Sequence, residues 1–382
     1  MQAFDHFFQL DPALHHLNHA AVAPWPIRTV ETVTRFAMEN GRIGSLEYDR
    51  WLETEQRLRA RLQRLIHARG TDEIALLKNT SEGLSFIAQG LDWRAGDNVV
   101  ITDQEFPSNR IVWEALAERG VETRAASLGG SDPETAICAA IDDRTRLVSV
   151  SAVQYATGLR LDLKRIGREC ERRQVLFCID AIQALGAETI DVREVRADFV
   201  VADGHKWMLG PEGVALFYCR RELIPALRLT EYGWHMTRHP GDFDRAEWAP
   251  AGDARRFECG SPNMLGIHAL DASLSVLEEA GIEKVREAVL ERTHYLAEWI
   301  ERLDGFEIVT PLADGRHLGI LSLRHETIPT SRLHQALSKA GVLCALRGGL
   351  IRLSPHFHTR TADLDAVIRV LQKFENPSTL DV

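Results

Sequence analysis

The chain has 382 residues, of which 45% are hydrophobic and 26% are charged, and its formal net charge is −10. This length allows a large buried core, and an acidic balance with no basic stripe argues against a nucleic-acid partner. The N-terminus has no basic region followed by an apolar stretch, no segment approaches the roughly 20 apolar residues of a membrane span, and the six cysteines form no C-x-x-C pair. We therefore expect a cytoplasmic globular protein without a signal peptide, a membrane span or a structural zinc site.

The first two thirds of the chain have the pattern of an α/β fold. Residues 46–66 form a charged segment with the apolar spacing of a solvated, packed helix. The predicted strands that follow are residues 74–78, 98–102, 123–127, 146–152, 175–180, 198–203 and 214–219. Helices are predicted between most of them, at residues 81–91, 108–120, 133–141 and 162–173. This alternation predicts a mostly parallel sheet with helices on both faces, and the short turn before the seventh strand predicts that this last strand is antiparallel.

The pattern changes after Gly252. Two long amphipathic helices are predicted at residues 263–281 and 283–305. Short strands at 319–324, 342–347 and 350–354 and a closing helix at 363–374 follow. We therefore predict a large domain over residues 15–252 and a smaller α+β domain that combines residues 253–382 with residues 1–14.

Polar clusters follow five of the predicted strands. They read "KNTSEG", "DQEFPSN", "SAVQYATG", "DAIQALG" and "DGHKW". Ligands of open α/β sheets bind beyond the carboxyl ends of the strands, so these clusters should converge on one rim.

The first two clusters suit a phosphate and an aromatic ring. Asn79, Thr80 and Ser81 precede a predicted helix, where hydroxyls and free backbone N–H groups bind anions. Phe106 is suited to lie flat on an aromatic ring.

The other clusters add the remaining groups of one cofactor. Asp180 ends a buried strand and is suited to pair with a protonated ring nitrogen. Gln154 and Gln183 are neutral donors suited to a phenolate oxygen or a substrate carboxylate, and Lys206 is suited to form an imine with an aldehyde. Phosphate, ring, ring nitrogen, phenolate and aldehyde together describe pyridoxal 5′-phosphate, PLP.

On these motifs the chain resembles the class V aminotransferases, a PLP-dependent group of fold type I that includes cysteine desulfurases, kynureninases and isopenicillin N epimerase-like proteins. The resemblance runs from "HLNHAA" to "RLSPHFHTR" and is most specific in "DAIQALG" followed by "DGHKWMLGPEGVALFY", with Asp180 twenty-six residues before Lys206. "EFPSN" is similar to the kynureninase-type motif, whose phenylalanine stacks on the cofactor. The resemblance implies the aspartate-aminotransferase type of fold, with a seven-stranded sheet in the large domain.

The resemblance also implies a role for each matched residue. Lys206 is matched to the Schiff-base lysine and Asp180 to the partner of the pyridine nitrogen. The phosphate is assigned to Thr80, Ser81 and His205, the phenolic oxygen to Gln183, the substrate carboxylate to Arg352 with Arg347 near a second arginine, and an entrance loop to His15, His16, Asn18 and His19. Ser261 in "ECGSPN" is matched to a residue that reaches the phosphate of the neighbouring subunit, so a homodimer with shared active sites is implied.

Two departures from the family pattern change what we expect. Asp203 stands where many relatives carry a small hydroxyl residue, and a carboxylate there repels phosphate unless it is turned away or neutralised. The chain also lacks the nucleophilic cysteine loop of the desulfurases, because "ALRGGLIRLSP" is a tight turn and Cys344 precedes Arg347 on a predicted strand. We therefore expect no persulfide on a cysteine of the enzyme.

The predicted function is an aminotransferase-like reaction at the α-carbon of an amino acid. The alternatives are a cysteine desulfurase or C–S lyase, an amino-acid epimerase and, from another class, a PLP-binding regulatory module. "HFH" at residues 356–358 has the spacing of a metal pair, but this spacing is common by chance, and we predict no metal.

Overall fold

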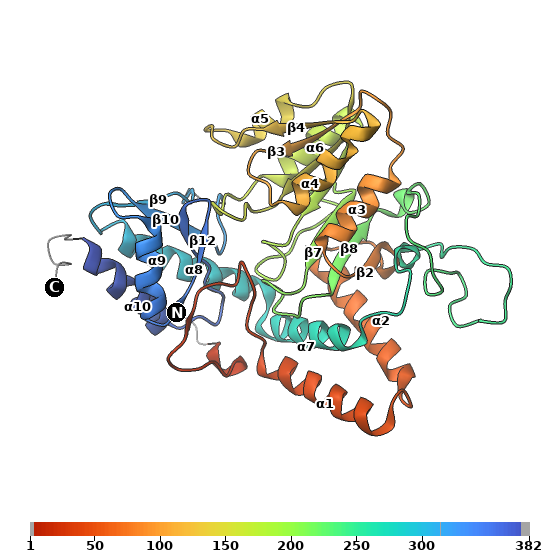
Figure 1. Cartoon of the computed structure of the whole chain (residues 1–382), viewed down its shortest axis with the longest axis horizontal. Coiled ribbons are helices and arrows are strands. Elements are labelled where there is room, and N and C mark those ends of the chain that lie inside the picture. Colours follow the sequence, from red (N-terminus) through yellow and green to blue (C-terminus); the bar gives the residue numbers. More distant parts are fainter. Residues whose placement is uncertain (1–3, 314, 376–382) are drawn as a thin grey trace.

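The structure is a computed structural model and describes residues 4–313 and 315–375. A large α/β body and a smaller α+β part lie side by side, with the N-terminal segment between them (Figure 1). The predicted fold class is confirmed.

A seven-stranded sheet forms the centre of the large body, in the order β2-β8-β7-β6-β5-β3-β4. Its strands are β2 (Ile74–Leu77), β3 (Asn98–Thr102), β4 (Glu122–Ala126), β5 (Thr145–Ser151), β6 (Leu176–Asp180), β7 (Phe199–Asp203) and β8 (Ala215–Cys219). Only β8 runs antiparallel to its neighbours, as predicted for the last strand of the series.

Helices cover both faces of this sheet because its strands are apolar on both sides. Val99 and Ile101 of β3 pack on one face in a core that includes α3 (Thr80–Gly90) and α4 (Ser108–Glu114). Val100 faces the other core, which is covered by a second set of helices. These are α2 (Tyr48–Leu65), α5 (Pro133–Ala139), α6 (Leu163–Arg173) and α7 (Met264–Ala280).

The smaller part has its own sheet, in the order β12-β13-β10-β9. The strands are β9 (Phe306–Ile308), β10 (Leu321–His325), β12 (Ala345–Arg347) and β13 (Leu350–Leu353). Helices α8 (Ile282–Ile300), α9 (Thr330–Lys339) and α10 (Thr361–Leu371) pack against them. The strand predicted at 342–347 is divided, because β11 (Val342–Leu343) pairs with N-terminal β1 (His15–His16) while β12 pairs with β13.

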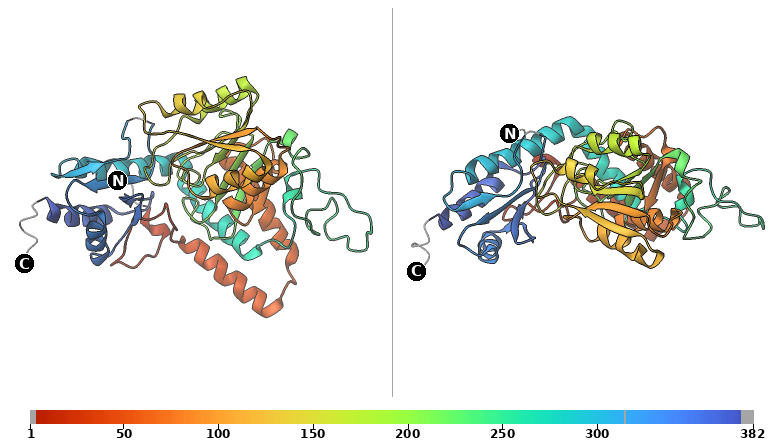
Figure 2. Two further views of the ribbon diagram at one scale, coloured as in Figure 1. Left: turned by 45° about the horizontal axis from the view of Figure 1, so that its top comes forward. Right: turned by 90° about the horizontal axis from the view of Figure 1, so that it is seen from above.

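Helix α1 (Ile27–Ile43) was not predicted, although its sequence is amphipathic, and Thr29 is its one buried residue. It lies against α7 and extends along the outside of the large body (Figure 2). Leu17 joins the smaller core, whereas α7 packs into the larger one. The division of domains at residues 252 and 253 stays a prediction.

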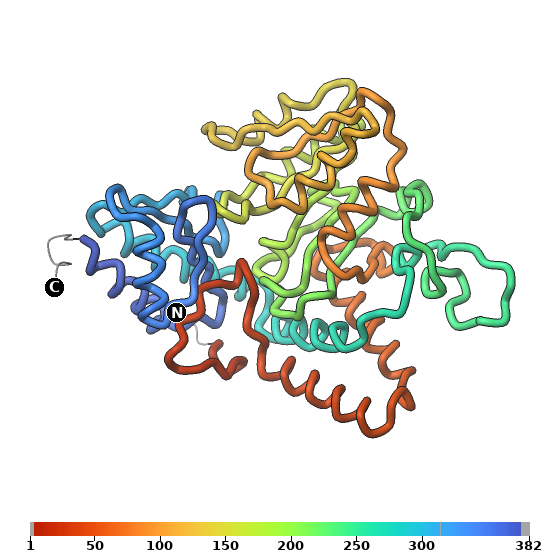
Figure 3. Tube along the Cα trace, in the orientation of Figure 1, coloured from red at the N-terminus to blue at the C-terminus, as the bar shows by residue number. Residues whose placement is uncertain are grey.

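The chain between β8 and α7 leaves the body as a long projecting segment (Figure 3). Its exposed aromatic side chains are Tyr232, Trp234, Phe243 and Trp248.

In the part of the chain that the structure describes, no helix combines the length and the apolar character needed to cross a membrane.

Candidate active site

The polar strand ends converge on one cavity of about 270 Å³, as the parallel sheet requires. It is lined by Ala20, Ala21, Val22, Thr80, Phe106, Ser108, Tyr155, Asp180, Ile182, Gln183, Asp203, His205, Lys206, Glu212, Arg347 and Arg352. Eight of the residues predicted for the site are among them: Thr80, Phe106, Asp180, Gln183, His205, Lys206, Arg347 and Arg352.

The turn after β7 that carries Lys206 is held by the side chain and carbonyl of the next residue, Trp207. The indole Nε1 donates to Gln183 Oε1 at 2.8 Å, and His356 Nε2 lies 3.0 Å from the Trp207 carbonyl oxygen. Gly186, with φ of +102°, packs so closely that a Cβ there would lie 2.2 Å from that same oxygen. These contacts hold the loop after Asp180 against the turn of Lys206. The motifs "DAIQALG" and "DGHKW" therefore depend on each other for their conformation.

Lys206 and Asp180 are both buried, and burial works against the charged form of each. Burial lowers the pKa of Lys206 and raises the pKa of Asp180. The Lys206 ammonium lies 5.5 Å from the centroid of the Phe106 ring. A lysine whose pKa is lowered has more of the neutral amine available as a nucleophile and base.

Unpaired polar atoms gather where the phosphate was predicted. Thr80 Oγ1 and His205 Nδ1 are buried without a hydrogen-bond partner among the described residues. Burial and the charge of Lys206 lower the pKa of His205 to about 4, so its ring is neutral. Ser81 does not line the cavity, but its hydroxyl donates to the hydroxyl of Ser108, which does.

Asp203 lies in the cavity wall beside these atoms. Its Oδ1 accepts the backbone N–H of Thr80 at 3.1 Å, and its Oδ2 lies 3.8 Å from His205 Nδ1. Burial raises the pKa of Asp203 to about 6. The carboxylate is thus turned toward the first N–H of α3, whose hydrogen bond offsets part of its negative charge and reduces its repulsion of an anion.

Among the described residues of the cavity, Arg352 has the most buried hydrogen-bond donors without a partner. It is 1% exposed, and its Nη1 donates to the Tyr155 carbonyl at 2.7 Å. Its Nε and Nη2 are buried and have no partner among the described residues. Burial lowers the pKa of Arg352 to about 10, which reflects a cation without an anion. A carboxylate bound here would supply the missing acceptors.

The remaining predicted residues lie away from the cavity wall. Gln154 donates through Nε2 to Thr102 and Glu105, while its Oε1 is buried and unpaired. Ser261 is exposed outside the cavity. Asn18 is half-buried and forms a bridge with Ser354. Their roles stay predictions.

Sequence reasoning did not single out Tyr155, Ser108 or Glu212, which also line the cavity. Tyr155 and Ser108 lie in the polar clusters that follow predicted strands, so this position in the sequence is the signal that points to them. Tyr155 packs edge-on against Phe106, with ring centroids 5.2 Å apart.

A cluster of four buried histidines lies behind the Lys206 turn and includes His19 of the predicted entrance loop. His19 Nε2 lies 3.3 Å from His358 Nε2, and the His19 ring lies 4.5 Å from the His16 ring and 5.2 Å from the His356 ring. Burial lowers the pKa of His16 to about 4, that of His356 to about 3, and those of His19 and His358 well below the usual value. The four histidines are therefore neutral, and in this form they join the N-terminal segment to the chain after β13.

We expect acid to destabilise the protein through this cluster. The unfolded chain takes up protons on these histidines below pH ~6.5, whereas the folded chain does so only near pH ~4 or lower, so the free energy of unfolding falls as the pH drops from 6.5 to 4. Several such residues make the loss several kcal/mol. The measurement is urea unfolding at stepped pH.

The matched variants are His358→Phe and His239→Gln. Phenylalanine replaces an imidazole that already stacks on Phe8 at 3.5 Å, so His358→Phe should flatten the dependence on pH. His239 is exposed, and its replacement should leave the slope unchanged. Equal slopes in both variants and the wild type would exclude His358 as a source.

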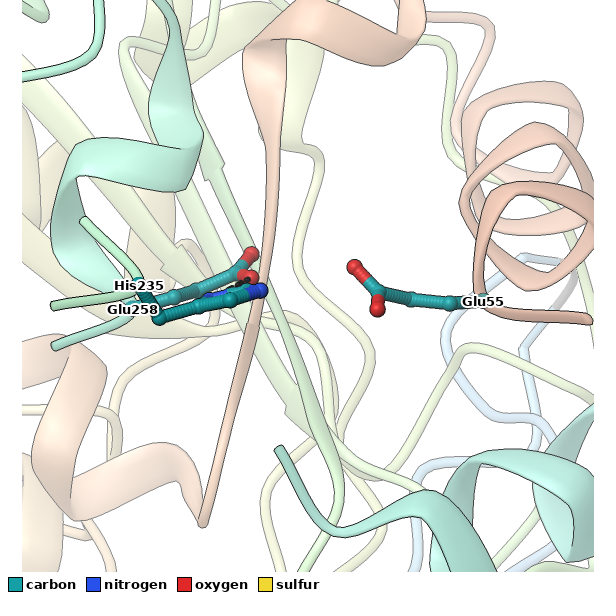
Figure 4. Close-up of side chains that lie close together, drawn as sticks. All are labelled: Glu55, His235 and Glu258. Atoms are coloured by element: carbon teal, nitrogen blue, oxygen red, sulfur yellow. Dashed lines mark ion pairs between the residues drawn. The ribbon is translucent and has the colours of Figure 1, made fainter. Parts of the chain in front are cut away.

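A second buried cluster brings together Glu55, His235 and Glu258 (Figure 4). Arg59 forms ion pairs with both carboxylates, each at 2.5 Å, and also donates to the carbonyl of Ile74. A cation would have to displace this guanidinium, so we interpret the cluster as a structural ion-pair network that ties α2 to β2.

The donor set in the main cavity fits PLP. The unpaired atoms of Thr80 and His205 lie at the amino end of α3, where an anion is favoured, and the Asp180 carboxylate lies at the end of β6. Phe106 and Lys206 are positioned for the ring and the aldehyde.

Comparisons with known proteins agree with this site. Residues 15–371 match the family described as aminotransferase class-V. A probable cysteine desulfurase of Methanothermobacter thermautotrophicus is 29% identical over 94% of each chain. An uncharacterised aminotransferase of Bacillus subtilis, YcbU, is 33% identical over 77% of this chain and 76% of its own.

Solved structures share the fold. The complex of the cystine C–S lyase C-DES with its product cysteine persulfide has a TM-score of 0.86 at 23% identity, covering 94% of this chain and 97% of that one. The apo cysteine desulfurase of Thermococcus onnurineus has a TM-score of 0.84 at 20% identity, covering 94% of each chain.

Proposed function

The chain belongs to the class V aminotransferase family of PLP-dependent enzymes, and from this premise we propose that it acts at the α-carbon of an amino acid whose carboxylate binds to Arg352. The observation that carries the proposal is the buried guanidinium of Arg352, with two donors unpaired, in the same cavity as Lys206. Burying a cation without an anion raises the free energy of the folded protein, and a bound substrate carboxylate would lower it again.

Each residue around the cavity would have a separate role in such a reaction. When bound, PLP supplies an electron sink for the bond that breaks at Cα. Lys206 has a lowered pKa, so its amine is suited to take up and return the Cα proton. Asp180 holds a proton at the ring nitrogen, and Phe106 covers the ring.

Replacement of Arg352 tests the proposal. Arg352→Met should weaken binding of amino-acid substrates about 100-fold, the loss typical of a buried, charge-paired contact. The measurement is a titration of the cofactor absorbance with an amino acid and with the corresponding amine that lacks the carboxylate. The wild type should prefer the amino acid and the variant should not. Retained preference in the variant would exclude Arg352 as the carboxylate site.

An aminotransferase-like reaction is the first candidate, and C–S bond cleavage is the second. The named relatives favour the second, since two of those described above are called cysteine desulfurases. No cysteine is among the described residues that line the cavity, and burial raises the pKa of Cys344 to about 12. Cleavage would therefore release sulfur without a persulfide on this chain.

An amino-donor screen separates these reactions. Transfer of the amino group to an added keto acid indicates an aminotransferase. Sulfide together with pyruvate from cysteine, or cysteine persulfide together with pyruvate from cystine, indicates C–S cleavage. Loss of optical activity indicates an epimerase. Cofactor binding without turnover of any donor would favour the regulatory module instead.

The proposal includes a homodimer with shared active sites. Ser261 is exposed outside its own chain's cavity, in a turn directly before α7. The projecting segment that precedes it carries Phe243, 78% exposed, and Trp248, 60% exposed. Large exposed aromatic side chains are typical of protein–protein interfaces, and a two-fold contact would complete both sites at once.

Mixed-subunit complementation tests the shared site. We expect Lys206→Ala subunits, mixed with a Ser261 variant that is inactive through weak PLP binding, to regain activity. Each heterodimer would have one site free of both lesions, up to about half the activity of a wild-type dimer. No recovery despite demonstrated subunit exchange, or a monomer by light scattering, would contradict the shared site.

A further inference from the structure

Glu105 is a buried carboxylate next in sequence to Phe106 of the proposed cofactor site. It lies between β3 and α4, immediately before Phe106, and is 6% exposed. Among the described residues no lysine, arginine or histidine forms an ion pair with it. It does not line the cavity, so any effect it has on the reaction must act through other residues.

Hydrogen-bond donors surround both oxygens of Glu105. Oε1 accepts from Thr102 Oγ1 at 2.7 Å, from the Ser151 backbone N–H at 3.0 Å and from Gln154 Nε2 at 3.4 Å. Oε2 accepts from Asn109 Nδ2 at 2.9 Å and from the Ser151 hydroxyl. The carboxylate therefore joins the end of β3, the end of β5 and the first turn of α4.

The hydrogen-bond partners of Glu105 favour the ionised carboxylate. Trp113 Nε1, which can only donate, bonds to Asn109 Oδ1 and so fixes Asn109 Nδ2 as the group that faces Glu105. The backbone N–H of Ser151 also can only donate. An ionised carboxylate accepts all five hydrogen bonds, whereas a protonated carboxyl would have to use the hydroxyl of Ser151 or Thr102 as its acceptor.

This charge lies close to Asp180. Ser151, which holds Glu105 twice, is the register partner of Asp180 across β5 and β6. Burial and the negative charge of Glu105 raise the pKa of Asp180, while Lys206 opposes the shift and Asp203 adds to it. The Asp180 carboxylate therefore has a greater affinity for a proton than it would have alone.

We propose that Glu105 is a positioning residue whose negative charge, held behind Asp180, keeps the proton on the pyridine nitrogen that Asp180 faces. The inference rests on the proposed function, in which Asp180 is the partner of that nitrogen. A second anion behind the first strengthens the field that the ring nitrogen meets, and the five donors keep this anion in place without a cation that would cancel it.

The test measures the ring nitrogen itself. Holoenzyme is reconstituted with ¹⁵N-labelled PLP, and the nitrogen chemical shift is followed against pH for the wild type, Glu105→Gln, Ser151→Ala and Asp180→Asn. We expect Glu105→Gln to lower the pH at which the ring nitrogen loses its proton by about one unit, the order of magnitude of the effect of one buried charge.

Ser151→Ala is the matched control. It removes the hydroxyl bond to Glu105 but leaves the charge and the backbone N–H bond, so the midpoint should stay at the wild-type pH even if the melting temperature falls. Equal shifts in Ser151→Ala and Glu105→Gln would attribute the effect to packing and overturn the proposal. No shift in Glu105→Gln would overturn it as well.

Asp180→Asn distinguishes this inference from the proposed site. A wild-type midpoint in Asp180→Asn would reject Asp180 as the partner of the nitrogen, whereas a shift there without one in Glu105→Gln would reject only the role of Glu105. If Glu105→Gln does not fold, Gln154→Lys places an ammonium beside the same carboxylate, and an unchanged midpoint in that variant rejects the proposal equally.

Discussion

Lys206→Ala is expected to abolish turnover while the chain stays folded. Lys206 is 8% exposed, and burial lowers its pKa, so its removal costs little stability. The variant loses both the amine that binds the cofactor covalently and the base placed at the reacting carbon, and no other lysine lines the described cavity. The measurement combines turnover with borohydride reduction and peptide mapping, which should place the cofactor label on Lys206.

Lys78→Ala is the matched control, because Lys78 follows β2 near the same edge of the sheet but is exposed and paired with Glu82. This variant should keep its activity and its label. A label on any lysine other than 206 in the wild type would exclude the assignment.

Asp180→Asn should leave PLP bound and reduce turnover by several orders of magnitude. An amide cannot hold the ring nitrogen protonated, and the loss should resemble the roughly 10⁴-fold effect of replacing the aspartate of a catalytic triad by asparagine. The fold should tolerate the change, because asparagine can still accept the Ile182 backbone N–H and a buried carboxyl with a raised pKa is removed. Turnover and the melting temperature are measured together.

Asp162→Asn is the control for a purely structural role. Asp162 accepts the Arg165 N–H at the start of α6, and asparagine caps helices equally well. Both variants should have similar stability, but only Asp180→Asn should lose activity. Near-normal turnover in Asp180→Asn would show that Asp180 serves only its local turn.

The large sheet and the cofactor chemistry were predictable because their signals are local. Each strand is a short apolar run, and the polar residues that follow it must meet at the carboxyl edge of a parallel sheet. The five clusters therefore predict that Lys206, Asp180, Thr80 and Phe106 lie on one rim, and the structure brings these four to one cavity.

Contacts between distant segments were decided only by the tertiary structure. The histidine cluster joins His16 and His19 to residues about 340 positions later, and no sequence period links them. The predicted strand at 342–347 is divided because its first two residues pair with the N-terminal β1 and its last three pair with β13. Helix α1, which was not predicted, is amphipathic but buries only Thr29.

The environment of the charged residues at the site was likewise not predictable from the sequence. Sequence alone showed Arg352 and Asp203 as residues of suitable type, and it did not single out Glu105. The unpaired donors of Arg352, the bond from Thr80 to Asp203 and the five donors around Glu105 all depend on which groups are buried together. Burial determines how strongly a charge is felt, and it arises only when segments far apart in the chain pack against each other and exclude water.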